Sequence, residues 1–302
     1  MILPEAYASA TIAEEPQAPP IPGEEVLGIM GKRNTKQDQS LTNKNLEIIQ
    51  KLNIIDDFLF AKMCEDKAVC EEILSTILER PIHVLKNDIQ YELRNAGARS
   101  VRLDCLCVDQ HGTYMNIEVQ NSNNDDHLKR MRYNAANIDT SFTEKGIRFE
   151  KLADIYVIYI AQFDIFGFGD IINHIDEVVR EHPEAQANSG IHKIVVNAAA
   201  ESKTKLGQLM KMFLNKHADQ GDFPAITARL NYLTKTEKGV NYMCKELNDY
   251  LEQRTNESHK QIALIQLKKG WLKDADAVME SFGVSRTVAE QWIAESKQPE
   301  HS

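Results

Sequence analysis

The sequence contains few cysteines, and their spacing matches no familiar pattern. Five occur in 302 residues: Cys64, Cys70, Cys105, Cys107 and Cys244. A small and odd number of cysteines argues against a fold held together by disulfides. A zinc site would need a second Cys or His pair at ligand spacing, and we find none. Cys105 and Cys107 alternate along one predicted strand and share its face with Leu103, which indicates thiols in a core. We therefore expect a reducing, cytoplasmic location.

Long apolar runs and an excess of positive charge are also missing. No segment approaches the run of about 20 apolar residues that a membrane helix needs, so we expect no membrane partner. The opening MILPEAYASATIAEEP lacks a basic segment and a continuous apolar segment, which argues against a signal peptide. The net charge of −10 excludes a protein that coats nucleic acid, because such binding depends on Lys and Arg. An enzyme that touches nucleic acid locally is still compatible with this charge.

The hydrophobic content of 42% is ample for a buried core, and composition divides the chain into three parts. Residues 1–45 begin with a stretch rich in Pro, Ala and Glu and are predicted to be disordered. Residues 46–200 alternate predicted helices and strands, whereas residues 201–302 show amphipathic helical patterns with no internal repeat. This order predicts an α/β fold with a mixed central sheet flanked by helices and followed by a helical C-terminal region.

Within residues 46–200 the pattern predicts individual elements. Residues 123–146 are typical of a helix, because Asn and Asp supply an N-cap and Leu128, Met131, Ala135, Ile138 and Phe142 keep a 3.6-residue rhythm. The apolar run ADIYVIYIAQF favours a strand covered on both faces. Further segments read as helix (IIDDFLFAKMCED and KAVCEEILSTILER) or strand (IHVLKNDIQYELR and HKIVVNAAA).

The segment RLDCLCVDQHGTYMNIEVQ, residues 102–120, is predicted to be a β-hairpin. A three-residue loop with Gly112 in the left-handed conformation is a common solution. Opposed residue numbers then add up to 222, so Asp104 faces Glu118, Arg102 faces Gln120, and Leu106 faces Asn116. Two carboxylates with Cβ atoms about 5 Å apart repel each other unless a proton or a cation compensates.

A divalent cation is one remedy for this repulsion. Mg²⁺ takes oxygen ligands from one or two carboxylates, and it can polarise a phosphoryl oxygen and acidify a bound water. The same alternation also fits an ordinary hairpin with one polar face, on which Asn116, Glu118 and Gln120 would simply be displayed. The residues alone leave both interpretations open.

The hairpin resembles the PD-(D/E)XK nuclease superfamily and, within it, the recombination-promoting nuclease / putative transposase family. That family shows R-x-D, a turn and N-I-E-x-Q, matched here by Arg102, Asp104, Asn116, Glu118 and Gln120. DDFLFAKMC resembles the family's opening helix, LKRMRYN its post-hairpin helix, and KGIRFEKLADIYVIYI its buried-strand passage. The resemblance covers roughly residues 50–270 and implies a restriction-endonuclease-like core.

What this resemblance implies is Mg²⁺-dependent (or Mn²⁺-dependent) cleavage of DNA. Asp104 and Glu118 would hold the metal with the Val119 carbonyl, and Asp57 would bind a second ion or a metal-bound water. Gln120 stands where the superfamily usually has Lys. Its amide carries no charge and accepts no proton, but it can orient the attacking water by hydrogen bonds.

Several assignments stay open on the sequence. Arg102 and Arg130 could contact DNA phosphates, whereas Arg102 could equally be the counter-ion of Asp104 or Glu118. Packing is the favoured role for Tyr133, and a helix cap for Asp56.

Residues 274–296 resemble a helix-turn-helix, with Gly283 in the turn and a second helix from Ser285 that exposes Arg286 and Thr287. The second helix also carries Glu290 and Glu295 and is not basic. A helical hairpin that packs on the body or joins two subunits of a homo-oligomer gives the same pattern.

The leading hypothesis is a metal-dependent DNA endonuclease of the transposase-associated type. The first alternative is a catalytically impaired nuclease-fold protein that binds DNA or a protein partner. The second is a helical interaction protein whose acid pair lies on a solvated surface.

Overall fold

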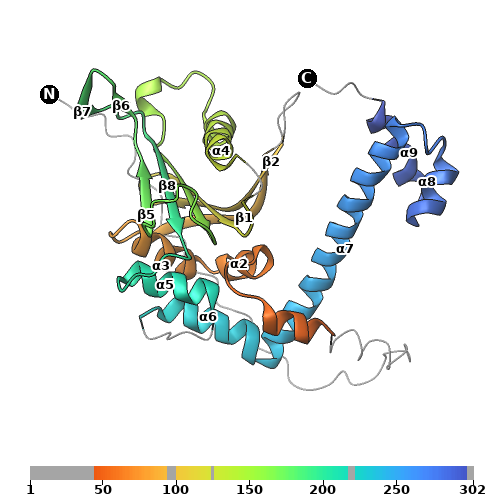
Figure 1. Cartoon of the computed structure of the whole chain (residues 1–302), viewed down its shortest axis with the longest axis horizontal. Coiled ribbons are helices and arrows are strands. Elements are labelled where there is room, and N and C mark those ends of the chain that lie inside the picture. Colours follow the sequence, from red (N-terminus) through yellow and green to blue (C-terminus); the bar gives the residue numbers. More distant parts are fainter. Residues whose placement is uncertain (1–43, 94–99, 124–125, 217–221, 298–302) are drawn as a thin grey trace, which may run out of the picture. The chain divides into compact units, whose positions relative to one another are not determined.

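The computed structural model describes residues 44–93, 100–123, 126–216 and 222–297 (Figure 1). The segment predicted to be disordered, residues 1–45, lies almost wholly outside the described residues. Residues 44–51 are helical.

A six-stranded mixed sheet forms the centre of the fold, with strand order β1-β2-β3-β4-β8-β5. The first three strands are antiparallel neighbours, β3, β4 and β8 run parallel, and β5 is antiparallel to β8. The strands are β1 (Val84–Leu93), β2 (Val101–Asp109), β3 (Tyr114–Gln120), β4 (Ile155–Ala161), β5 (Ile172–Ile175) and β8 (Ile191–Asn197). Every residue of β4 except Tyr156 is buried, which confirms the strand covered on both faces.

Helices cover both faces of this sheet, and Figure 1 shows α4 on one face with α2, α3, α5 and α6 toward the other. Because β3 and β4 are parallel, the chain needs a crossover between them, and α4 provides it. These helices are α2 (Asp57–Cys64), α3 (Lys67–Ile77), α4 (His127–Phe142), α5 (Lys205–Leu214) and α6 (Pro224–Lys235). The mixed α/β class predicted from the sequence is confirmed.

Helix α4 begins as predicted, because the Asp126 side chain accepts a hydrogen bond from Lys129 N. Met131, Ala135 and Ile138 form its buried stripe, but Leu128 is 42% exposed and the prediction for it was wrong. In this first turn of the helix the buried residue is His127, whose ring lies near Tyr159 of β4, and Leu128 faces solvent. Residues Phe149–Lys151 form a short 3-10 helix before β4.

The C-terminal region consists of helices, as expected. They are α7 (Glu237–Lys268), α8 (Ala275–Phe282) and α9 (Arg286–Ser296). Gly283, with φ of +67°, ends α8, and Ser285 caps α9, so a short turn joins these two helices. Val278 and Trp292 of this hairpin pack in one cluster with Ala263 of α7. Although α7 has 32 residues, no helix within the described ranges has the length and apolarity that a membrane crossing requires.

The hairpin register follows the prediction. Gly112 has φ of +80°, and Asp109 N donates to Thr113 O at 3.1 Å. Leu106 pairs with Asn116, and the neighbouring pairs keep the same sum of 222. The expectation of a displayed polar face was wrong, because Asn116, Glu118 and Gln120 are buried. Helix α4 packs over this face of the sheet and excludes solvent.

One further expectation from the strand patterns was wrong, and three strands were not expected. Leu103 does not share a core with Cys105 and Cys107, but packs in the cluster on the α4 face. Tyr91, the β1 residue that pairs with Leu103, also packs against the cluster on the α4 face. Gln90, which directly precedes Tyr91 in β1, has φ of +50°. The sequence analysis also did not predict β5, or the small second sheet of β6 (Val178–Val179) and β7 (His182–Gln186), because all three are short and none contains a buried apolar run.

Candidate active site

Strands β2 and β3 bring Asp104 and Glu118 together, one rung beyond the last regular pair of the hairpin, Cys105–Ile117. The two acids are linked through backbone groups. Asp104 N donates to Glu118 Oε1 at 3.3 Å, and Val119 N donates to Asp104 Oδ2 at 3.1 Å. Asn116 Nδ2 also donates to Glu118 Oε1, at 3.1 Å. Both carboxylates therefore have fixed positions on adjacent strands.

Burial makes this pair electrostatically costly. Glu118 is fully buried, and its pKa is raised well above the usual range, first by desolvation and then by the charge of Asp104. Desolvation, followed by the charge of Asp57, raises the pKa of Asp104 to about 6. A cation at this point would relieve both effects. The donor set fits a hard divalent ion, because Mg²⁺ prefers carboxylate and carbonyl oxygens.

Helix α4 contributes a positive charge to the same point. Arg130 Nη2 lies 3.5 Å from Glu118 Oε2, and Arg130 Nη1 lies 3.4 Å from Gln120 Oε1. Its charge lowers the pKa of both Asp104 and Glu118, although burial outweighs it. Because α4 is the crossover between β3 and β4, the topology places this guanidinium over the acid-bearing end of β3.

The site opens into a cleft of about 970 Å³. Its walls include six of the seven residues singled out from the sequence: Asp57, Arg102, Asp104, Val119, Gln120 and Arg130. The seventh, Glu118, is buried behind this surface. Helix α7 adds wall residues that the sequence did not indicate: Gln253, Arg254, Glu257 and Gln261. No local signal marks them, because they belong to a long polar helix and reach the cleft only through tertiary folding.

Asp57, the first residue of α2, is solvent-exposed at this cleft. Partial desolvation raises its pKa and Asp56 adds to the effect, whereas Arg254 and Arg102 oppose it. Asp56 occupies the N-cap position but does not cap the helix with its side chain, contrary to prediction. Its carboxylate instead accepts from Asn53 N at 2.6 Å, because the chain turns there.

The structure also assigns partners to Arg102 and Tyr133. Arg102 Nη1 lies 3.6 Å from Glu257 Oε1 of α7 and forms an ion pair with that residue. The charge of Arg102 also lowers the pKa values of Asp104 and Asp57. Tyr133 packs against the cluster on the α4 face of the sheet, as expected.

A second cleft of about 480 Å³ adjoins the first and shares Arg102 and Arg130 with it. Lys129 and Arg132 also line it, and Asp126 is the one acidic residue among the described residues of its wall. Lys129 Nζ pairs with Asp126 at 2.7 Å. The sequence analysis missed Lys129 and Arg132, because charges on the outer face of a helix are usually solvated.

An acid pair on an antiparallel hairpin, whose second strand runs parallel to a buried central strand, defines a nuclease-like α/β domain of the restriction-endonuclease type. The family model described as PD-(D/E)XK nuclease family transposase matches residues 56–194 of the chain. The match extends from α2 into β8 and confirms the resemblance read from the hairpin. No curated protein and no solved structure matches the chain.

Proposed function

We propose that the protein is a Mg²⁺- or Mn²⁺-dependent DNA endonuclease that hydrolyses phosphodiester bonds. The observation that carries this proposal is the pair of Asp104, which is half-buried, and Glu118, which is fully buried, beside a large polar cleft. Two carboxylates with raised pKa values are costly to bury, and a hard cation removes that cost. Sites with such perturbed groups in a cleft are frequently catalytic.

The residues take distinct roles in this proposal. Asp104 and Glu118 hold the ion together with the Val119 carbonyl, and Asp57 binds a second ion or orients a metal-bound water. A bound divalent ion polarises the phosphoryl oxygen and lowers the pKa of a coordinated water. Gln120 orients the attacking water through its amide.

Arg130 supplies the positive charge that Gln120 lacks. Its guanidinium contacts both Gln120 and Glu118, so a positive charge lies beside the residue that replaces the usual lysine. An arginine stabilises the charge that develops on the phosphoryl oxygens, but it cannot act as an acid or base because its pKa exceeds about 12. The proton of the attacking water would therefore have to be accepted by a group other than Arg130.

DNA is the proposed substrate because the basic cleft adjoins the acid pair. Arg102, Lys129, Arg130 and Arg132 line one continuous surface around the site. Guanidinium groups bind phosphate oxygens in a bidentate geometry, which fixes a strand but reads no sequence. We place this activity in the cytoplasm, since the five cysteines are free and buried.

A specific contact favours the second candidate, a catalytically impaired DNA-binding protein. Arg130 lies 3.5 Å from Glu118 Oε2 and therefore partly neutralises the pair without any metal. If this contact persists when a divalent ion is offered, the fold binds DNA but does not cleave it.

A plasmid-nicking assay with isothermal calorimetry separates the candidates. Wild type is incubated with supercoiled plasmid and Mg²⁺ or Mn²⁺ beside an Asp104→Ala, Glu118→Ala double variant. Asp139→Asn, which removes a half-buried carboxylate of α4 outside both clefts, is the matched control.

Nicking by wild type and Asp139→Asn, but not by the double variant, supports the endonuclease. DNA binding without nicking, or divalent-ion binding that is unchanged in the double variant, points to the impaired protein. Equal nicking by all three preparations contradicts the assignment of the site.

A further inference from the structure

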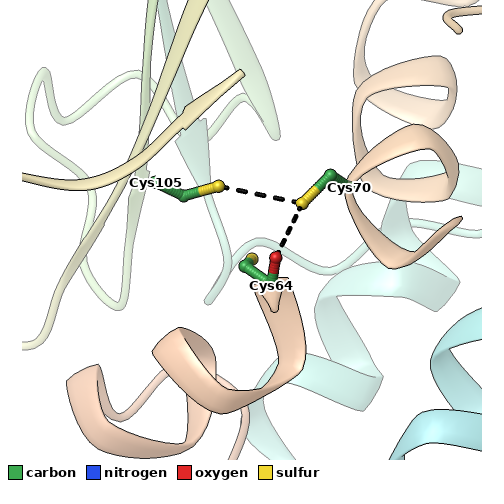
Figure 2. A group of neighbouring side chains, drawn as sticks. All are labelled: Cys64, Cys70 and Cys105. Atoms are coloured by element: carbon green, nitrogen blue, oxygen red, sulfur yellow. Dashed lines mark hydrogen bonds between the residues drawn. The ribbon is translucent and has the colours of Figure 1, made fainter. Parts of the chain in front are cut away.

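Four of the five cysteines gather at one place in the core, away from the cleft. Figure 2 shows Cys64 at the end of α2, Cys70 in α3 and Cys105 in β2 pointing to a common centre. The Sγ atoms of these three residues lie within 4.8 Å of one another. Cys107, two residues along β2, has its Sγ 3.6 Å from that of Cys105. All four side chains have no exposed surface.

The distances among these sulfurs suit ligands of one metal ion. A Zn–S bond of about 2.3 Å in a tetrahedron places neighbouring sulfurs about 3.8 Å apart. The observed Sγ–Sγ distances are 3.7 Å for Cys70 and Cys105 and 3.6 Å for Cys105 and Cys107. Thiols in plain van der Waals contact lie at a similar distance. A metal site is therefore indicated by the convergence of three thiols from three elements, with Cys107 Sγ beside Cys105 Sγ, and not by any single distance.

The chemistry of the group selects the metal. Thiolates are soft ligands that favour Zn²⁺, Cu⁺ and iron–sulfur clusters over hard ions. An iron–sulfur cluster must place its own sulfides among the protein ligands, and sulfurs this close leave no room for them. Four thiol ligands in a tetrahedral arrangement are typical of structural zinc.

We propose that Cys64, Cys70, Cys105 and Cys107 form a structural site for one thiophilic metal ion, Zn²⁺ in the reduced protein. Each thiol releases its proton to solvent when it binds, so metal binding is coupled to deprotonation. Because the four side chains are inaccessible in the folded chain, the ion enters while the chain folds.

Such an ion would connect the elements that carry two of the cleft carboxylates. Helix α2 begins at Asp57 and ends at Cys64, and in β2 Cys105 directly follows Asp104. The metal ties the end of α2 to the middle of β2, which fixes the position of Asp57 relative to Asp104. This site is chemically separate from the acid pair, and the inference does not depend on nuclease activity.

The test uses the full chain with reductant present. Protein unfolded in guanidinium chloride with EDTA is refolded with Zn²⁺, with Co²⁺ or with neither, and bound metal per chain is measured by elemental mass spectrometry. We expect one tightly held ion per chain and, for Co²⁺, thiolate-to-metal charge-transfer absorption. We also expect the melting temperature of wild type to rise by several degrees when Zn²⁺ is present during refolding.

Variants locate the ion. Cys70→Ser and Cys105→Ser should lose it, whereas Cys244→Ser, which removes the buried cysteine outside the group, should keep it. The Asp104→Ala, Glu118→Ala double variant should also keep it, which distinguishes this site from the acidic one.

Three outcomes would overturn the proposal. In the first, wild type refolds equally well with no metal and shows no cobalt bands. In the second, the ion is lost from the Asp104→Ala, Glu118→Ala variant and kept by the cysteine variants, and in the third, a chain mass reduced by two hydrogens reveals a disulfide. The wild-type measurements decide the question even where a serine variant fails to fold.

Discussion

At the scale of single residues, desolvation of the acid pair lowers the stability of the folded state and raises the pKa values of both carboxyl groups. Glu118 is fully buried, and the pKa of Asp104 is raised from 3.8 to about 6, mainly by desolvation. Between these two values the folded state holds a proton that the unfolded state has lost. Without metal, the free energy of unfolding therefore decreases as pH rises through this window, by on the order of 3 kcal/mol in total from Asp104.

We predict that, in EDTA, wild type loses stability relative to Asp104→Asn as pH rises from about 4 to above 6. The neutral amide has no proton to lose, so the difference reports the Asp104 carboxylate together with the effect of its charge on Glu118. Urea unfolding of both proteins at several pH values measures it. Saturating Mg²⁺ should reduce the difference by stabilising wild type, and a difference that is flat with pH would contradict the buried-pair interpretation.

The contact of Arg130 with Gln120 and Glu118 leads to a second prediction at this scale. Arg130→Ala should lower the single-turnover cleavage rate at saturating DNA by about 100-fold, because it removes a charge aimed at the reacting phosphate. Its neighbour Arg132 lines only the basic cleft, so Arg132→Ala should weaken DNA binding and leave the saturated rate unchanged. A saturated rate that is unchanged in both variants would place both arginines in binding alone.

At the scale of elements, the junction between α6 and α7 controls where the α7 wall of the cleft lies. Gly239 lies in the first turn of α7, and its amide donates to the Thr236 side chain that caps the helix. A Cβ atom at Gly239 would collide with the backbone carbonyl of Tyr232 in α6. The two helices therefore approach each other more closely than any residue with a side chain allows.

We predict that Gly239→Ala destabilises the protein by about 1–3 kcal/mol, as overpacking does. In an unconstrained helix the same change stabilises by up to about 1 kcal/mol, so the sign itself is diagnostic. Guanidinium unfolding measures the effect. Lys238→Ala, at the exposed neighbouring position, should change stability by less than about 0.5 kcal/mol.

At the scale of the whole molecule, a net charge of −10 coexists with a local basic surface. Binding to DNA should therefore depend on a few phosphate contacts and not on a general positive field. With about four such contacts, the slope of log affinity against log salt is about −4 for duplex DNA. Fluorescence anisotropy over a range of KCl concentrations measures this slope.

In the same titration, Arg132→Ala should make the slope shallower by about one contact. Arg148→Ala removes an exposed arginine outside both clefts and should leave it unchanged. A wild-type slope near −10 would show that the protein engages DNA over a much larger surface.

Local rules were sufficient to predict the hairpin and the central strand. The turn at Gly112 and the period of two fixed which residues oppose each other, and an unbroken apolar run marked β4. These signals work because they depend on neighbours in the chain and on burial on both faces.

What escaped prediction depends on tertiary packing. The wall residues of α7, such as Arg254, are separated from the hairpin by more than a hundred residues. The cysteines of α2, α3 and β2 converge only when a helix pair packs on the sheet. The change of face at Leu103 accompanies a positive φ angle at Gln90. A glutamine in the sequence does not indicate such an angle, which is uncommon for residues other than glycine.

The distance along the chain between the two sides of the cleft has a consequence for synthesis. Glu118 leaves the ribosome 135 residues before Gln253, the first wall residue of α7 (253 − 118 = 135). At about 5–20 residues per second, this gap lasts on the order of 10 s. For that interval the nascent chain can pair its two acids on a folded hairpin while the α7 side of the cleft has not yet been synthesised.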